Sequence, residues 1–166
     1  MTESITRILV PVDFSSHSDR AFRYALRLAS RFGASVELLH VVDNPLASGA
    51  WTAEVYVPNL PEMLDSLLRE AEKRLAALKL SAAGERVSVE THVSTGQPAH
   101  TIVEHARTGG FDLIVMGTHG RTGFSHMFVG SVAERVVRRA LCPVLTVHDT
   151  TRPAEEAEPP AAQAAA

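Results

Sequence analysis

Short apolar runs alternate along this chain with longer segments of helical periodicity. The first run is apolar at every position, which is typical of a parallel strand buried on both faces. The third run alternates apolar and polar residues, which predicts a strand at an edge of the sheet. The predicted strands are Ile8–Val12, Val36–Val42, Val87–Val93, Asp112–Met116 and Val144–Val147.

The segments between these runs place apolar residues three or four positions apart, as amphipathic helices do. The first helix is predicted to open with a capping box, Ser16 to Asp19, and to stop at Gly33. Ser131 and Glu134 match the same capping pattern at the start of the fourth helix. The other predicted helices are Pro61–Leu80 and Gln97–Arg107, and the fourth is Ser131–Ala140.

Two of these helices carry clear apolar stripes that predict their buried faces. On the first helix the stripe is Phe22, Ala25, Ala29 and Phe32, and a second stripe is Arg20, Arg23, Arg27 and Arg31. On the second helix the stripe is Leu64, Leu67, Leu68, Ala71, Leu75 and Leu78. Regular alternation of strand and helix predicts an α/β fold, a single Rossmann-like domain whose parallel sheet has helices on both faces.

Composition narrows the class of protein further. The chain has 166 residues, 45% of them hydrophobic, and a net charge of −3, which fits one globular domain and gives no indication of nucleic-acid binding. Its single cysteine, Cys142, cannot form an internal disulfide, and no run is long enough to span a membrane, so we expect a cytoplasmic protein. We expect the domain to cover residues 1–149 and the tail, 150–166, to be disordered. The long connection Asp43–Leu60 is of a kind that is often functional.

A glycine-punctuated loop follows the fourth predicted strand, with the spacing G-x2-G-x9-G-S from Gly117 through Gly120 to Gly130 and Ser131. Glycines let backbone N–H groups approach an anion closely, and the next helix begins with unpaired N–H donors. The loop has no lysine of the Walker type, and Arg121 is its only permanent cation. These residues fit a phosphate site, and on their own they fit a strand–helix connection without a ligand equally well.

Asp13 follows the first buried strand, at the carboxyl end where open α/β sheets bind their ligands. A carboxylate at that position could accept hydrogen bonds from ribose hydroxyls. The simpler interpretation is that Asp13, with Ser15 or Ser16, caps the helix that follows.

Three segments together resemble the universal stress protein family, in its ATP-binding branch. They are residues 8–15 (ILVPVDFS), the Gly117–Glu134 loop with its GSVAE end, and residues 142–147 (CPVLTV), within a similarity that covers residues 5–148. The resemblance implies a five-stranded parallel sheet of order 3-2-1-4-5, which would bring Asp13 and the glycine loop to one crevice. It also implies a homodimer that pairs Val144–Val147 with its copy.

The resemblance further implies an ATP site, or one for ADP or AMP, with Mg²⁺ accompanying the phosphates and no metal ligand from protein side chains. Pro11, Asp13 and the backbone at Val41 would frame adenine and ribose, and Met116 and Gly117 would line the adenosine. The residues at the phosphates would be Gly120, Gly130, Ser131 and Val132. The predicted nucleotide-binding residues are Pro11, Val12, Asp13, Val41, Met116, Gly117, His119, Gly120, Arg121, Gly130, Ser131 and Val132.

The favoured hypothesis is a nucleotide-dependent switch or sensor in the stress response, whose output is binding to a protein partner that the sequence does not identify. A slow ATPase or nucleotidyl-transferring enzyme is the alternative, and the missing lysine disfavours it. A third hypothesis is a nucleotide-free dimerisation module, which an empty crevice after gentle purification would favour.

Overall fold

A computed structural model of the chain describes residues 4–43, 59–118 and 130–148. The interior of the predicted long connection and the tail predicted to be disordered lie outside these residues. The elements are β1 (Arg7–Pro11), α1 (Ser16–Phe32), β2 (Ser35–Asp43), α2 (Leu60–Leu80), β3 (Val89–Gly96), α3 (Pro98–Thr108), β4 (Leu113–Gly117), α4 (Ser131–Arg139) and β5 (Val144–Val147).

The strands form one parallel sheet of order β3-β2-β1-β4-β5. Strand β1 lies at its centre, where Ile8 is in register with Val36 of β2 on one side and with Leu113 of β4 on the other. The predicted fold class and strand order are therefore confirmed, and β3 lies at an edge as its alternating pattern predicted. Because the order reverses direction at β1, the connections that follow β1 and β4 lead to helices on opposite faces of the sheet, and a crevice opens between them.

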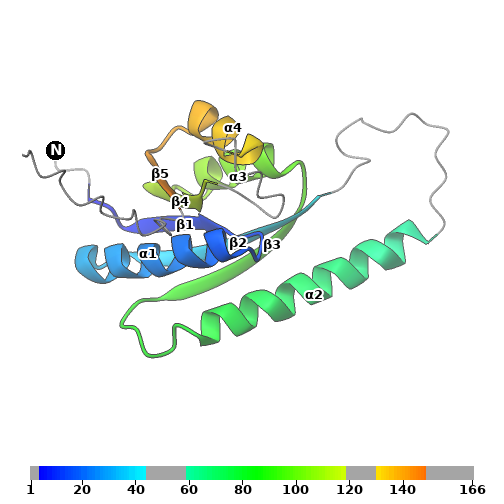
Figure 1. Ribbon diagram of the computed structural model, residues 1–166, viewed down its shortest axis with the longest axis horizontal. Coiled ribbons are helices and arrows are strands. Elements are labelled where there is room, and N and C mark those ends of the chain that lie inside the picture. The colour runs from blue at the N-terminus through cyan, green and yellow to red at the C-terminus, as the bar shows by residue number, and fades with distance from the viewer. Residues whose placement is uncertain (1–3, 44–58, 119–129, 149–166) are drawn as a thin grey trace, which may run out of the picture.

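Helices cover both faces of the sheet (Figure 1). Successive residues of β1 point to opposite sides, so Ile8 and Val10 pack with α1 and α2, while Leu9 packs with α3 and α4. All three side chains are fully buried, as a central parallel strand requires. The two resulting cores fix the positions of the strand ends that carry the site.

The helix starts differ from the predicted capping boxes by one residue. The N-cap of α1 is Ser15, whose hydroxyl accepts a hydrogen bond from the Ser18 amide at 3.2 Å, and not Ser16. The N-cap of α4 is Gly130, with no side-chain cap, and Ser131 is the first helical residue. The predicted C-terminal stop of α1 at Gly33 is confirmed.

The apolar stripes are buried only where a helix lies over the sheet. Phe22, Ala25 and Ala29 of α1 are buried as predicted, but Phe32 at its last turn is 54% exposed. In α2 the buried residues are Ala71 and Leu75, and the expected burial of the earlier leucines fails. The first turns of α2 extend past the end of the sheet in Figure 1, so they have no strand to pack against.

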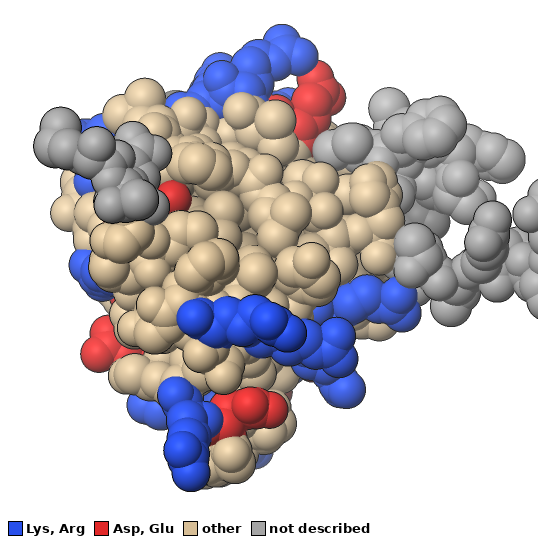
Figure 2. All heavy atoms as spheres, turned by 90° about the vertical axis from the view of Figure 1, so that its left-hand side faces the viewer, with Lys and Arg blue, Asp and Glu red and all other residues tan. Residues whose placement is uncertain are grey.

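Charged side chains lie on the outer sides of the helices. On α1, Arg23, Arg27 and Arg31 are exposed, and Arg23 pairs with Asp19 at 2.9 Å. In Figure 2 the Lys and Arg side chains of one face lie in separate groups with uncharged surface between them. An exposed pair of this kind contributes little to stability, so these charges serve mainly to solvate the helices.

Candidate functional site

A cavity of about 620 Å³ lies at the carboxyl ends of β1, β2 and β4, where the strand order reverses. Its walls come from these strand ends, from the starts of α3 and α4, and from one side of α2. This volume is within the range typical of small-molecule sites. The cavity therefore lies where an open α/β sheet is expected to bind its ligand.

The cavity brings together every predicted site residue that the structure describes. These residues are Pro11, Val12, Asp13, Val41, Met116, Gly117, Gly130, Ser131 and Val132. The other three, His119, Gly120 and Arg121, lie outside the described residues. The expectation that the first and fourth strands converge on one crevice is met in the geometry.

Asp13 lies partly buried at the end of β1, and its carboxylate is held by Ser15. Oδ1 accepts hydrogen bonds from the Ser15 hydroxyl at 2.6 Å and from the Ser15 amide at 3.1 Å. Burial is the largest single influence and acts to raise the pKa of Asp13, but the hydrogen bonds from Ser15 and Ser18 and from the Asp13 backbone together outweigh it and leave the pKa below its usual value. Asp13 is therefore ionised at neutral pH, and it lines the cavity as a carboxylate.

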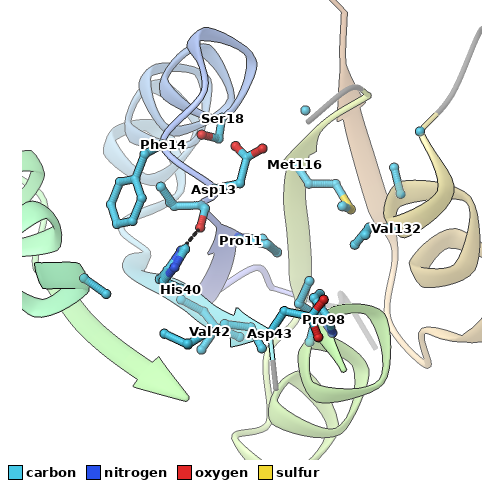
Figure 3. Close-up of a pocket in the computed structure, with 18 of the residues that line it drawn as sticks. Pro11, Asp13, Phe14, Ser18, His40, Val42, Asp43, Pro98, Met116 and Val132 are labelled. Atoms are coloured by element: carbon cyan, nitrogen blue, oxygen red, sulfur yellow. Dashed lines mark hydrogen bonds between the residues drawn. The ribbon is translucent and has the colours of Figure 1, made fainter. Parts of the chain in front are cut away.

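Asp13 contacts the residue that caps α1 and also lines the cavity. Asp13 does support the helix, because it orients Ser15, and Ser15 caps α1. The same carboxylate lines the cavity. In Figure 3, Asp13 points into the space between α1 and the strand that carries Met116.

Close packing requires a glycine at position 117, which the glycine spacing in the sequence did not indicate. A Cβ at this position would lie 2.9 Å from the Cβ of His17 and 3.0 Å from its backbone carbon. The end of β4 thus packs directly against the first turn of α1, and a larger residue would push the two apart. This contact sets the width of the crevice on that side.

The start of α4 forms the opposite wall of the crevice. The Gly130 amide donates to the Thr118 carbonyl at 2.6 Å, so this amide joins the two ends of the loop and is not directed at a ligand. Ser131 and Val132 follow at the first helical positions, where amides have no partner within the helix and the helix dipole favours an anion. The anion-binding capacity of this wall therefore begins at Ser131.

Sequence reasoning missed the part of the cavity that faces α2. Phe14, His40 and Arg74 line it, together with Leu67 and Glu70. His40 is 7% exposed, and its Nδ1 lies 2.6 Å from the Val12 carbonyl oxygen, to which it donates. The signal in the sequence that could have indicated it was His40, a polar residue flanked by two apolar residues on each side within β2.

The assembled site combines three kinds of group. Pro11, Val41 and Met116 offer apolar surface, Asp13 offers a carboxylate that accepts hydrogen bonds, and the start of α4 offers backbone donors. Such a site suits a ligand with a flat apolar part, hydroxyl groups and an anionic group. Within the described residues no cluster of three His, Cys, Asp or Glu side chains could hold a metal ion.

The fold and the crevice together define a doubly wound α/β protein with a ligand site at its topological switch point. Comparison with known proteins narrows this class. The universal stress protein family model matches residues 4–148. The universal stress protein MJ0531 of Methanocaldococcus jannaschii is 39% identical over 147 residues, covering 85% of this chain and 81% of the relative.

Solved structures similar to this chain also include universal stress proteins. Universal stress protein UspA from Lactobacillus plantarum superposes with a TM-score of 0.74 at 32% identity, covering 86% of this chain and 97% of that one. A universal stress protein in complex with cAMP superposes with a TM-score of 0.56 at 27% identity, covering 87% and 98%. The chain belongs to the universal stress protein family. No helix in the part of the chain that the structure describes is long and apolar enough to cross a membrane.

Proposed function

We propose that this protein binds an adenine nucleotide, either ATP with Mg²⁺ or ADP or AMP, in the crevice between β1 and β4. It would then act as a nucleotide-dependent switch in the stress response, with binding to another protein as its output. The observation that carries the proposal is the placement of an ionised Asp13 and the start of α4 on opposite walls of one cavity. The cAMP complex of a family relative adds support, because cAMP shares adenine, ribose and phosphate with ATP.

Each part of the nucleotide has a matching wall. Pro11, Val41 and Met116 would hold adenine through apolar contact, and Asp13 would accept hydrogen bonds from the ribose hydroxyls. The Ser131 hydroxyl and the amides at the start of α4 would hold the phosphates, with Mg²⁺ on the phosphate oxygens. His119, Gly120 and Arg121, which lie outside the described residues, would complete the phosphate side.

We further propose that the protein works in the cytoplasm as a homodimer. The single cysteine is compatible with a reducing compartment. Strand β5 lies at the edge of the sheet, where it can pair with a second copy. Mass spectrometry of the small molecule that co-purifies with the protein would identify the nucleotide directly.

Removal of the Asp13 carboxylate is the sharpest test of the binding site. A hydrogen bond to a charged group contributes roughly 1.5–3 kcal/mol, which corresponds to a change in affinity of about 10- to 100-fold. We expect Asp13→Ala to weaken Mg²⁺-ATP binding by that factor in isothermal titration calorimetry. An affinity equal to that of the unchanged protein would contradict the assignment of Asp13.

Asp112→Ala is the matched control. Asp112 is also a hydrogen-bonded carboxylate, but it lies at the amino end of β4, whereas the cavity lies at the carboxyl ends of the strands. We expect this variant to lose stability and to keep its ATP affinity. If both variants lost affinity alike, the effect would reflect general destabilisation. Failure of the unchanged protein to bind any adenine nucleotide would refute the proposed function.

A further inference from the structure

Phe14 has a backbone conformation that a phenylalanine rarely adopts. Its φ is 65°, in the left-handed region, and it directly follows Asp13 at the end of β1. For a residue other than glycine this conformation costs about 1–2 kcal/mol, so it persists only where its surroundings enforce it. The contacts of the Phe14 side chain show what enforces it.

The Phe14 ring lies between two side chains from different elements. The ring centroids of Phe14 and His40, which belongs to β2, lie 4.5 Å apart. The guanidinium carbon of Arg74, on α2, lies 4.0 Å from the centroid of the Phe14 ring. Both distances are typical of favourable aromatic and cation–π contacts. We call Phe14, His40 and Arg74 the aromatic clamp.

The clamp is hydrogen-bonded, through His40, to the backbone of the residue before Asp13. The Val12 carbonyl accepts a hydrogen bond from His40 Nδ1 at 2.6 Å, and the Val12 amide donates to the Leu39 carbonyl at 2.8 Å. The peptide before Asp13 is therefore held by β2, and the residue after it by the clamp. In Figure 3, Phe14 and His40 lie side by side, and Asp13 points away from them.

The left-handed turn at Phe14 thus sends two neighbouring side chains in different directions, one into the clamp and the other toward the crevice. Ser15 holds the far side of the Asp13 carboxylate. From this geometry we infer that the aromatic clamp positions Asp13 and thereby sets how well the site holds the ribose hydroxyls. Phe14, His40 and Arg74 are positioning residues in this scheme, and the inference rests on the proposed function.

A ligand without ribose hydroxyls separates this role from a general structural one. Phe14→Gly keeps the left-handed φ at no steric cost but removes the ring. We expect it to weaken Mg²⁺-ATP binding about tenfold and to leave the already weak binding of 2′,3′-dideoxy-ATP unchanged. Phe14→Tyr, which keeps the ring, should restore the ATP affinity to within about twofold.

Arg74→Met tests the same clamp without altering the core, because Arg74 lines the cavity as an exposed residue and is not part of the buried core. It removes the cation and keeps a long side chain over the ring, so we expect a drop in ATP affinity of about threefold, again absent for 2′,3′-dideoxy-ATP. Circular dichroism of each variant checks that the fold is intact, and if Phe14→Gly does not fold, the Arg74→Met comparison decides.

Three results would overturn the inference. Equal weakening of both ligands would mean that the clamp acts through general structure and not through Asp13. Unchanged ATP affinity in the folded clamp variants would remove the clamp from binding and leave the proposed function standing. Failure of the unchanged protein to bind ATP would overturn both the inference about the clamp and the proposed function.

Discussion

At the scale of single residues, one carboxylate joins the amino ends of β1 and β4. Asp112 Oδ2 accepts hydrogen bonds from the Thr6 amide at 2.8 Å, the Thr6 hydroxyl at 2.7 Å and the Arg7 amide at 2.9 Å. The Thr6 amide is the largest of the influences that lower the pKa of Asp112, and its hydroxyl comes next. Asp112 thus ties the strand ends that face away from the crevice.

Asp112→Asn should therefore lower stability in a pH-dependent way. We expect a loss of about 1 kcal/mol at neutral pH, below the range usual for bonds to a charged group because solvent screens this partly exposed site. Since the folded-state pKa is lowered, the stabilisation is fully present above the ordinary aspartate value of about 3.9 and is lost as the pH falls through the folded-state value. Urea unfolding at pH 7 and at successively lower pH would measure the narrowing gap between the two proteins.

Asp65→Asn is the control for this experiment, because Asp65 forms an exposed pair with Arg69 on α2. Its effect should be small at every pH. A gap between the unchanged protein and Asp112→Asn that does not change with pH would show that packing, and not charge, is responsible.

Single residues also show where sequence reasoning stops. Asp13 could be placed in the crevice because the end of a buried strand in an open α/β sheet is a known ligand position. The contact between Phe14 and Arg74 could not be predicted from the sequence, since it joins residues 60 positions apart and depends on the left-handed turn at Phe14. Gly117 lines the cavity, but its close contact with His17 could not be predicted, because that contact exists only in the folded chain.

At the scale of elements, α1 ends because of one backbone conformation. Gly33 has φ of 69° and ψ of 26°, and its amide donates to the Ala29 carbonyl as a C-cap. A Cβ at this position would meet nothing within 4 Å. The requirement for glycine is therefore one of backbone conformation alone.

Gly33→Ala should cost about 1 kcal/mol, and Gly33→Asn less, because asparagine tolerates the left-handed region better. For a domain of this size the loss corresponds to a decrease in Tm of roughly 2–4 °C. Gly84→Ala is the matched control, since its Cβ also enters open space and Gly84 has no left-handed φ. Equal melting temperatures for Gly33→Ala and Gly84→Ala would contradict this account.

Helix starts were harder to predict than helix stops. The sequence pattern favoured Ser16, which has Asp19 three residues later, but the hydrogen bonds that Ser15 makes with Asp13 select Ser15 as the cap. The apolar stripe of α2 was also misleading, because Leu67 is 46% exposed at the rim of the cavity. Periodicity identifies the apolar side of a helix, but the length of the neighbouring sheet decides how much of that side is buried.

At the scale of the whole molecule, the alternation of strands and helices was enough to predict a parallel sheet covered on both faces. It could not give the order of the strands, since several right-handed arrangements share that alternation. The order came from the resemblance of three short segments to a family, and it is the order that brings β1 and β4 together at the crevice.

The same order leaves β5 at an edge of the sheet, and its hydrogen-bonding pattern shows which groups are available to a second copy. The Pro143 and Val147 carbonyls accept from the Ile114 and Thr118 amides of the β4 side. Backbone groups alternate in direction along a strand, so the amide of Thr146 points to the outer edge. Within the described residues, no strand pairs with that edge.

Thr146→Pro should therefore abolish the proposed dimer and keep the monomer fold. Proline removes the outward N–H without removing a bond to β4, and it is tolerated on edge strands. Light scattering should give a dimer for the unchanged protein and a monomer for Thr146→Pro, with similar circular dichroism. Thr146→Val keeps the amide and should remain dimeric. A Thr146→Pro protein that is still a dimer would show that the copies associate through another surface, and the edge of β5 would then be free for a different partner.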